Sequence, residues 1–500
     1  MNLSKSRYVR GIQCPKMLWM EQHMPEQFDE SVLNTVVLDT GSAVGDLAMG
    51  YYGDFVEVPF DASNLAGMAA RTEELLAAGT PVICEATFAI DGCLCMVDIL
   101  RVENDGVRIV EVKSSTHMDE IYYHDMAFQT WVLRSCGLNV KSVALMHLNN
   151  QYVRDGELDL QGLFMVEDST ETVMEMQDEI AGRIALLKET ADQTEEPDIP
   201  IGCQCGVQYP CGYRGWCWRD VPSPSVFDLN GISMKKGLAW LDDGVATPAD
   251  ALTAGVKLNN RQRIQAEAEA ADLDTVIDSE AIAQFLNELW FPLYFLDFET
   301  IQPAVPLFDG TRPYQQIPTQ YSLHILREPG GELEHREFLA ETGADPRRAV
   351  AERLAADIPA GVCTLAYNMG FEKGRIKELA DTFSDLADRL LPINESMRDL
   401  IVPFKGGAYY ARAMGGSNSI KAVLPALFPD DPELDYHALD GVHNGIEAMA
   451  AFADLANMDP QEAARTRESL LRYCELDTLA MVKIWQKLTA AVQENESPTV

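Results

Sequence analysis

The chain has 500 residues, of which 47% are hydrophobic and 23% are charged, and its 78 acidic and 39 basic residues give a formal net charge of −39. This length predicts two or three domains, and the composition is that of a globular protein able to bury large cores. The charge excludes a surface that binds a phosphate backbone over its whole extent. No apolar run approaches the ~20 residues that cross a bilayer, so we expect no membrane partner.

The N-terminal segment is basic but has no apolar stretch of the kind found in secretory signals, so we expect a cytoplasmic, reducing location. In that setting, eleven cysteines indicate metal ligands and buried thiols rather than disulfides. The excess of acid fits adaptation to salt, solubility, or acidic clusters that hold metal ions while nucleic acid meets local basic patches. One such patch contains Lys5, Arg7, Arg10 and Lys16.

Residues 1–225 form the first region and read as an α/β domain. A helix is expected at 120–137, ending at Gly137. The strands expected before it are residues 81–90, 93–102 and 107–115.

Carboxylates and a lysine fall on these strands. Asp98 lies on the second strand, while Glu111 and Lys113 share one face of the third because side chains alternate along a strand. Asp98 and Glu111 can bind a divalent ion, and Lys113 can stabilise a hydroxide or the charge that builds on a phosphate. Glu85, on the preceding strand, and Gln129, on the following helix, can join them. The simpler alternative is an exposed strand edge with alternating charges.

The end of this region is rich in cysteine. Cys205, Cys211 and Cys217 are spaced C-x5-C-x5-C, and Cys14 lies far upstream. Four thiolates complete a tetrahedral set for zinc or for a 4Fe–4S cluster, and the wide spacing favours the bulkier cluster. Cys203 competes with Cys205 as a ligand, and four unrelated reduced thiols are the simpler alternative.

The first region resembles the RecB-type branch of the PD-(D/E)xK nucleases, on the Asp98, Glu111, Lys113 and Gln129 pattern. One cysteine before the nuclease core and three after it resemble the iron–sulfur staple of the AddB nuclease and of CRISPR-associated RecB-type exonucleases. This resemblance implies a restriction-endonuclease-like core and a 4Fe–4S cluster. The implied cluster ligands are Cys14, Cys205, Cys211 and Cys217.

The rest of the chain divides into a connector, a second α/β domain and a tail. Residues 226–288 are mostly polar and helical, residues 289–490 carry strands followed by long helices, and residues 491–500 read as a polar, frayed tail. The strands expected in the second domain are residues 294–300, 319–328 and 361–369.

Within the strand 294–300, Asp297 and Glu299 point to the same side of an otherwise apolar segment. Two like charges in a core are costly, and Mg²⁺ or Mn²⁺ with oxygen ligands would compensate them. Tyr473 and Asp477, four apart on a C-terminal helix, share one face. Glu372, in a strand-to-helix turn, can bring a further carboxylate to a two-metal site, as can Asp399, and Tyr473 would orient the attacking water.

The order of these residues resembles the tyrosine subclass of the DEDD exonucleases, the DnaQ-like branch of the ribonuclease H fold. Asp297 and Glu299 match its Asp-x-Glu motif, and Tyr473 and Asp477 match its Tyr-x-x-x-Asp motif. Its second motif normally ends in aspartate, where this chain has Glu372. The simpler alternative is a carboxylate pair at a strand end and a solvated pair on a helix.

The whole chain resembles a bacterial and archaeal family that joins a RecB-like iron–sulfur nuclease to a DEDD-type domain of unknown function. The resemblance implies a metal-dependent nuclease in DNA processing, repair or defence, with DNA preferred over RNA as the expected partner. It implies either a 3′–5′ exonuclease on single-stranded ends or a nuclease with two metal sites. Two alternatives stay open: a nucleic-acid-binding or assembly factor with degenerate sites, and a zinc-stapled RNA-processing enzyme. Candidates for stacking and phosphate contacts are Tyr409, Tyr410, Arg412 and Lys421.

Overall fold

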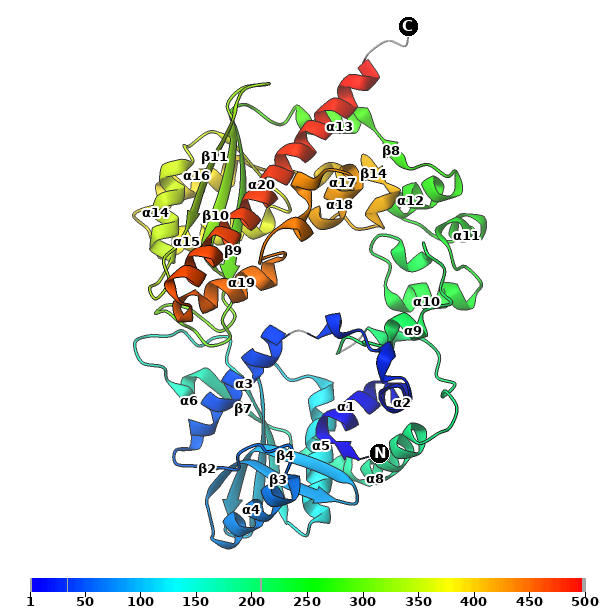
Figure 1. Ribbon diagram of the computed structural model, residues 1–500, viewed down its shortest axis with the longest axis vertical. Coiled ribbons are helices and arrows are strands. Elements are labelled where there is room, and N and C mark those ends of the chain that lie inside the picture. Colours follow the sequence, from blue (N-terminus) through cyan, green and yellow to red (C-terminus); the bar gives the residue numbers. More distant parts are fainter. Residues whose placement is uncertain (1, 34, 207–208, 497–500) are drawn as a thin grey trace. The chain divides into compact units, whose positions relative to one another are not determined.

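The computed structural model describes residues 2–33, 35–206 and 209–496 (Figure 1). It confirms the expected mixed α/β class and divides into two compact units. Unit 1 consists of Met1–Asp220 together with Pro303–Gln315, and unit 2 consists of Val221–Gln302 and Gln316–Val500. Among the described residues, no helix is both long enough and apolar enough to span a membrane.

Unit 1 is built on a seven-stranded sheet in the order β2-β3-β4-β5-β6-β7, with β1 beside β4. Its strands are β1 Leu3–Ser4, β2 Val56–Glu57, β3 Val82–Ile90, β4 Cys93–Glu103, β5 Gly106–Lys113, β6 Val140–Leu148 and β7 Phe164–Asp168. Its helices are α1 Lys5–Gln13, α2 Pro15–His23, α3 Thr35–Met49, α4 Leu65–Ala77, α5 Glu120–Ser135, α6 Leu160–Leu163, α7 Thr170–Glu175, α8 Gln177–Ala191 and α9 Arg214–Cys217.

Helices cover both faces of this sheet because apolar residues alternate along its central strands. On β5, Ile109 packs in the core that contains α5 and α8, whereas the next residue, Val110, packs in the core that contains α3. Glu111 continues the Ile109 side by the same alternation. The buried face under α5 therefore receives the carboxylate that was expected to act as a ligand.

Strands β4 and β5 separate where the expected site begins. Their antiparallel ladder runs from Glu103–Gly106 to Ile99–Val110 and then stops. Beyond that point β1 pairs with the start of β4 and leads directly into α1. The Val112 N–H at the separation donates to Asp98 Oδ2 over 2.7 Å, so a side chain replaces the missing ladder partner.

Unit 2 contains a five-stranded sheet in the order β11-β10-β9-β12-β13 and a two-stranded β8–β14 ribbon. Its strands are β8 Thr275–Ile277, β9 Leu293–Ile301, β10 Ile317–Leu326, β11 Leu333–Leu339, β12 Cys363–Ala366, β13 Met397–Asp399 and β14 Tyr409–Ala411. Its helices are α10 Met234–Asp242, α11 Pro248–Thr253, α12 Asn260–Ala270, α13 Ser279–Leu286, α14 Arg347–Asp357, α15 Gly370–Thr382, α16 Ala387–Ser396, α17 Val402–Gly406, α18 Ile420–Leu427, α19 Gly445–Asp454 and α20 Pro460–Glu496.

The faces of β9 are divided between two cores. Leu293 and Phe295 pack in the core that contains α13, α18 and α20, whereas Leu296 and Phe298 pack in the core that contains α14, α15 and α16. In Figure 1, α20 (red) crosses the sheet on the first of these faces. Asp297 continues the row of Leu293 and Phe295 toward α20 because side chains alternate.

Two segments of unit 2 are more ordered than their composition indicates. Residues 226–288, expected as a connector, form α10–α13 and β8 and contribute to a small core around Val226, Trp240 and Ala266. Helix α20 continues to Glu496, well into the segment expected to be a frayed tail, and Ala491 is buried. The mostly polar composition near the C-terminus does not reveal this packing, because a packed helix needs an apolar residue only at every third or fourth position.

Candidate active sites

In unit 1, the expected carboxylates and lysine come together at the separation of β4 and β5. Glu111 is fully buried, and its Oε1 accepts a hydrogen bond of 2.6 Å from Lys113 Nζ. Gln129 Nε2, on α5, donates to Glu111 Oε2 over 2.6 Å. Asp98 lies beside them, and its charge acts on that of Glu111.

Two further residues of this site were not among the candidate site residues. Lys5 Nζ on α1 donates to Glu111 Oε1 and Oε2, over 3.0 and 3.1 Å, and to Asp98 Oδ1 over 3.3 Å. Asp125 on α5 accepts from Lys113 over 2.9 Å and from Gln129 over 2.9 Å. Asp125 lies four residues before Gln129 on one helix face, a signal that the sequence contains. Lys5 had been assigned to a basic surface patch, and only the tertiary structure places it here.

The pKa values of the two carboxyls, Asp98 and Glu111, are shifted in opposite directions. Burial and the charge of Glu111 raise the pKa of Asp98 to about 6, against the opposing charges of Lys5 and Lys113. Burial also opposes ionisation of Glu111, but the charges of Lys113 and Lys5 and the hydrogen bonds from Lys113 and Gln129 outweigh it. Together they hold the pKa of Glu111 well below its usual range. Glu111 is therefore held as the anion, whereas the environment of Asp98 disfavours its anion.

Glu85 completes the unit 1 group from β3. Its φ of 54° lies in the left-handed region, and the β3–β4 ladder omits the pair that it would form with Asp98. Burial and the Asp98 charge raise the pKa of Glu85 to about 7. A non-glycine residue in this conformation costs about 1 kcal/mol or more and is common at functional sites.

The four expected cysteines of unit 1 also converge. Cys14, Cys205, Cys211 and Cys217 line one small cavity between the start of α2 and the segment around α9. Burial, together with the neighbouring thiols, raises the pKa of Cys211 to about 11. Cys203 is exposed and does not line this cavity. All four side chains are partly exposed, and four sulfur donors around one cavity are a set that could hold a metal centre.

In unit 2, carboxylates from a strand and a helix meet at one point. Asp297 and Glu299 on β9 and Asp477 on α20 each offer an oxygen within 4.8 Å of the others. Tyr473 lies one turn before Asp477 on α20 and lowers the pKa of that carboxyl. Glu372 at the start of α15 is 2% exposed, and its charge acts on that of Asp297.

The carboxylates of unit 2 are strongly desolvated and repel one another. Burial and the Asp477 charge raise the pKa of Glu299 to about 8, and burial together with the Asp399 charge raises the pKa of Glu372 to about 8. Burial followed by the charges of Asp477, Glu372 and Glu299 raises the pKa of Asp297 well above its usual range. Glu372 Oε2 is buried without a hydrogen-bond partner. This all-oxygen donor set fits Mg²⁺ or Mn²⁺, which would supply the missing positive charge.

Two further residues at this site lower the pKa of Asp477 instead of raising it. Tyr436, in a 3-10 turn at Tyr436–Ala438, donates to Asp477 Oδ1 over 2.5 Å. Lys421 on α18 lowers the pKa of Asp477 through its charge, although burial raises it overall to about 6. Tyr436 was missed because nothing in its local sequence marks it. Lys421 was expected only as a phosphate contact.

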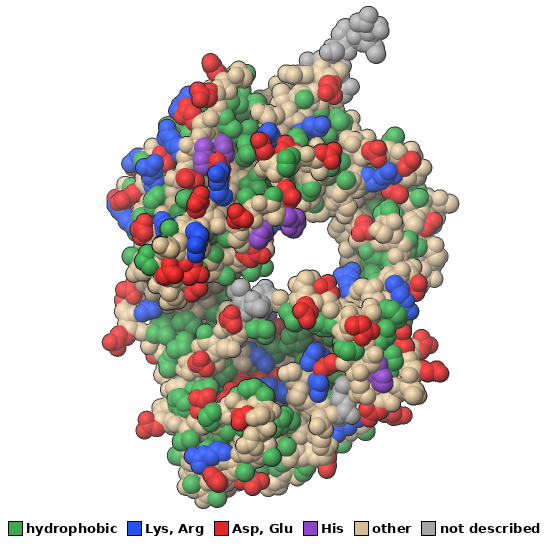
Figure 2. All heavy atoms as spheres, viewed as in Figure 1, with side chains coloured by type: hydrophobic (Ala, Val, Ile, Leu, Met, Phe, Trp, Pro, Cys, Tyr) green, Lys and Arg blue, Asp and Glu red, His purple; other side chains and the backbone are tan. Residues whose placement is uncertain are grey.

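An open depression of about 870 Å³ adjoins Tyr436 and Lys421, with His443 and Asn444 on its wall. Of the other residues expected to contact nucleic acid, Tyr409 is buried in the core. Arg412 is paired with Asp272 and Asp274. Figure 2 shows acidic side chains spread over the visible face among basic ones.

Comparisons with known proteins give no activity. Residues 294–419 match a domain of unknown function, DUF2779. An uncharacterized MG366 homolog of Mycoplasma pneumoniae is 28% identical over 227 residues, which cover 41% of this chain and 34% of that protein. The uncharacterized protein MG366 of Mycoplasma genitalium is 22% identical over 228 residues, covering 42% of this chain and 34% of that protein. The chain thus spans about a third of these relatives. No solved structure matches.

Proposed function

We propose that the protein is a divalent-metal-dependent nuclease that hydrolyses phosphodiester bonds in DNA, as a 3′–5′ exonuclease on single-stranded ends. The observation that carries this proposal is the meeting of Asp297, Glu299 and Asp477 within 4.8 Å, with Asp477 buried and the other two carboxylates partly buried. Such a group is costly unless divalent cations compensate it. The mixed five-stranded sheet that carries Asp297 is compatible with the ribonuclease H-like fold that the motifs indicate.

The roles in unit 2 follow from the geometry. Bound Mg²⁺ or Mn²⁺ would activate water and stabilise the charge on the phosphate and the leaving oxygen. Asp297, Glu299 and Asp477 would hold these ions, with Glu372 in reach. Burial and the Asp477 charge raise the pKa of Tyr473 far above neutrality, so its hydroxyl stays protonated and can orient water but cannot act as a base. Lys421 would attract the phosphate.

Unit 1 offers a second site of the PD-(D/E)xK kind. Asp98 and Glu111 would bind a divalent ion, with Lys113 placed to stabilise charge on the phosphate. Gln129 holds Glu111 and Asp125 in place. The cavity lined by Cys14, Cys205, Cys211 and Cys217 would hold a 4Fe–4S cluster, with zinc as the competing occupant.

The test is degradation of 5′-end-labelled single-stranded DNA and RNA by anaerobically purified full-length protein with Mg²⁺ or Mn²⁺. We expect progressive shortening of the labelled DNA strand, and its loss with EDTA. Asp297→Asn tests the unit 2 site and Lys113→Met tests the unit 1 site. We expect each variant to lower the rate of DNA cleavage by the site that it changes by 100-fold or more. Asp459→Asn, exposed at the start of α20, and Lys141→Met, on the surface, are matched controls.

The outcomes separate the alternatives. If neither DNA nor RNA is degraded with either metal, the nuclease proposal is wrong, and a shift of labelled DNA in a gel would favour a binding factor. Degradation of RNA alone by a colourless, zinc-containing protein would favour the RNA-processing alternative. Immediate release of the 5′ label as a mononucleotide would exclude 3′–5′ polarity.

A further inference from the structure

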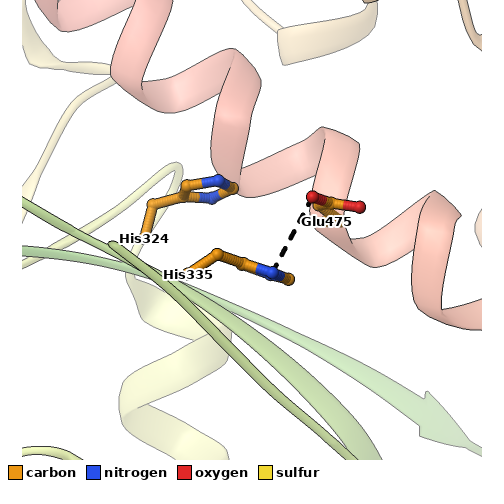
Figure 3. A group of neighbouring side chains, drawn as sticks. All are labelled: His324, His335 and Glu475. Atoms are coloured by element: carbon orange, nitrogen blue, oxygen red, sulfur yellow. Dashed lines mark ion pairs between the residues drawn. The ribbon is translucent and has the colours of Figure 1, made fainter. Parts of the chain in front are cut away.

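A cluster of two histidines and a glutamate lies on another side of α20. His324 on β10 and His335 on β11 are direct partners in the antiparallel ladder, with ring centroids 4.6 Å apart. Glu475 on α20 faces them, with its Oε1 3.7 Å from His335 Nδ1 (Figure 3). One donor atom from each of the three side chains lies within 4.8 Å of the others.

Two hydroxyl groups hold the far side of both imidazoles. Ser322 Oγ lies 2.9 Å from His335 Nε2, and Thr478 Oγ1 lies 2.8 Å from His324 Nδ1. The two hydroxyls are 2.7 Å apart, and Thr478 also donates to the Glu475 carbonyl over 3.1 Å. One proton arrangement satisfies the whole chain: each imidazole N–H donates to its hydroxyl, Ser322 donates to Thr478, and Thr478 donates to the carbonyl.

This arrangement leaves lone pairs on the near side of the cluster. His324 Nε2 and His335 Nδ1 are then both acceptors, and His335 Nδ1 faces a carboxylate. The separation of 3.7 Å is too long for a hydrogen bond, so two electron-rich groups face each other without a donor between them. A cation between them would remove the repulsion.

Burial is the main cause that lowers the pKa of His324, to about 4. His324 is 4% exposed, while the side chains of His335 and Glu475 are 23% and 32% exposed. Ions and water therefore reach the cluster from one side. Arg472 contacts Glu475 Oε2 over 3.5 Å and leaves Oε1 to the histidines.

We propose a binding site for a divalent transition-metal ion, with Zn²⁺ as the preferred ion. Its ligands are His324, His335 and Glu475. Two imidazoles and a carboxylate plus water are a donor set of zinc, and the hydroxyl groups behind the imidazoles act as the outer hydrogen-bond partners that metal-bound histidines use. A tetrahedral zinc with bonds of ~2.0–2.2 Å separates its ligand atoms by about 3.4 Å, so the side chains must close by roughly 1 Å.

The position gives the ion a structural role. Ser322 is the ladder partner of Asp297, and Thr478 follows Asp477 on α20. An ion bound to Glu475 and to the two strands would hold α20 against β10 directly behind the carboxylates of unit 2. This site differs in chemistry from those carboxylates because nitrogen ligands select zinc over Mg²⁺.

The test uses full-length protein stripped with EDTA and equilibrated with Zn²⁺ at buffered free concentrations. His335→Gln and Glu475→Gln change partly exposed side chains, and His117→Gln alters an exposed histidine elsewhere as a control. We expect wild type and the control to bind one more zinc per chain than either cluster variant. We also expect zinc, but not Mg²⁺, to raise the thermal midpoint more in wild type than in these variants.

Zinc bound by the cysteines of unit 1 cancels in this comparison because all variants keep them. Co²⁺ provides a second readout, since a site of nitrogen and oxygen ligands gives weak visible bands without the intense sulfur-to-metal absorption. Equal zinc content and equal thermal shifts in wild type and both cluster variants would overturn the proposal. DNA degradation is not part of this test, so its result is separate from the nuclease proposal.

Discussion

Lys5 donates hydrogen bonds to both carboxylates that we propose as ligands of a divalent ion in unit 1. An ammonium group and a metal ion compete for the same oxygens, so metal binding must displace or repel Lys5. Its charge also helps to keep Glu111 ionised in the fully buried position. Lys5 therefore stabilises the metal-free protein and weakens metal binding at the same site.

The first prediction concerns Lys5→Met. We expect about tenfold tighter Mn²⁺ binding at the unit 1 site, equivalent to ~1.4 kcal/mol, because a competing positive charge is removed. The metal-free variant should be less stable, by at most about 3–5 kcal/mol, because Glu111 loses a buried partner. Calorimetric Mn²⁺ titration and thermal unfolding measure these two effects, with Lys141→Met as the control. Unchanged or weaker Mn²⁺ binding would contradict the competition.

The second prediction concerns pH and the carboxylates of unit 2. The pKa of Glu299 and that of Glu372 are about 8, against ~4.3 in an unfolded chain. The folded state then binds more protons between these values. The stability that these two protonated carboxyls contribute is therefore fully present below pH ~4.3, falls as the pH rises, and is lost above pH ~8. Thermal unfolding in EDTA from pH 5 to 8 measures this loss.

Added Mn²⁺ should flatten that pH dependence, because the ion replaces the protons that offset the repulsion. The double variant Glu299→Gln, Glu372→Gln should flatten it without metal, because both carboxyls with raised pKa values are removed. The interpretation fails if the metal-free wild type keeps a constant stability, or gains stability, over this range.

At the scale of single elements, period and spacing predicted much of both candidate sites. Alternation along a strand placed Asp297 with Glu299, and the four-residue helix period placed Tyr473 with Asp477. These rules work because they depend only on backbone geometry within one element. The strands expected at 81–90, 93–102 and 294–300 agree with β3, β4 and β9 within one residue at each end.

The rest depends on contacts between elements. Lys5 reaches its carboxylates only because β4 and β5 separate and β1 enters beside β4. Tyr436 reaches Asp477 from a short turn 41 positions away. The third case is the β3 backbone, since a glutamate at φ 54° inside an apolar strand has no signature in the amino-acid order.

The third prediction uses this strained position on β3. Glu85→Gly should stabilise the metal-free protein by about 1 kcal/mol or more, because glycine adopts a positive φ freely and a buried carboxylate is removed. The same variant should lower DNA cleavage by the unit 1 site, measured in an Asp297→Asn background. Glu85→Gln keeps the backbone strain and isolates the effect of the charge. Destabilisation by Glu85→Gly would contradict the assignment of strain.

At the scale of the whole molecule, the N-terminal helices join the cysteine cavity to the carboxylates of unit 1. Lys5 begins α1, and Cys14 lies between the end of α1 and the start of α2. Gln13 Nε2 donates to the carbonyls of Gln204 and Tyr209, which binds this turn to the cysteine-rich segment. The position of Lys5 therefore depends on how firmly the cysteines are held together.

The fourth prediction concerns the cysteines. Cys14→Ser should abolish absorbance at about 400 nm if a 4Fe–4S cluster is bound, and should increase amide exchange in α1, because a ligand on the turn is lost. Cys203→Ser should change neither, since Cys203 is exposed and lies off the cavity. Iron and zinc analysis of both variants identifies the metal. Equal iron content in Cys14→Ser and wild type would remove Cys14 from the ligand set.

Pro303–Gln315 belongs to unit 1 although it follows the first part of unit 2 in the chain. Within unit 1, Arg154 donates to the Pro306 carbonyl over 2.9 Å, and Tyr314 donates to the Ser114 carbonyl over 2.7 Å, next to Lys113. The ribosome supplies this last piece roughly a hundred residues after Asp220, or about 5–20 s later at ~5–20 residues per second. During synthesis, the surface of unit 1 therefore stays incomplete until after β9 of unit 2 has been made.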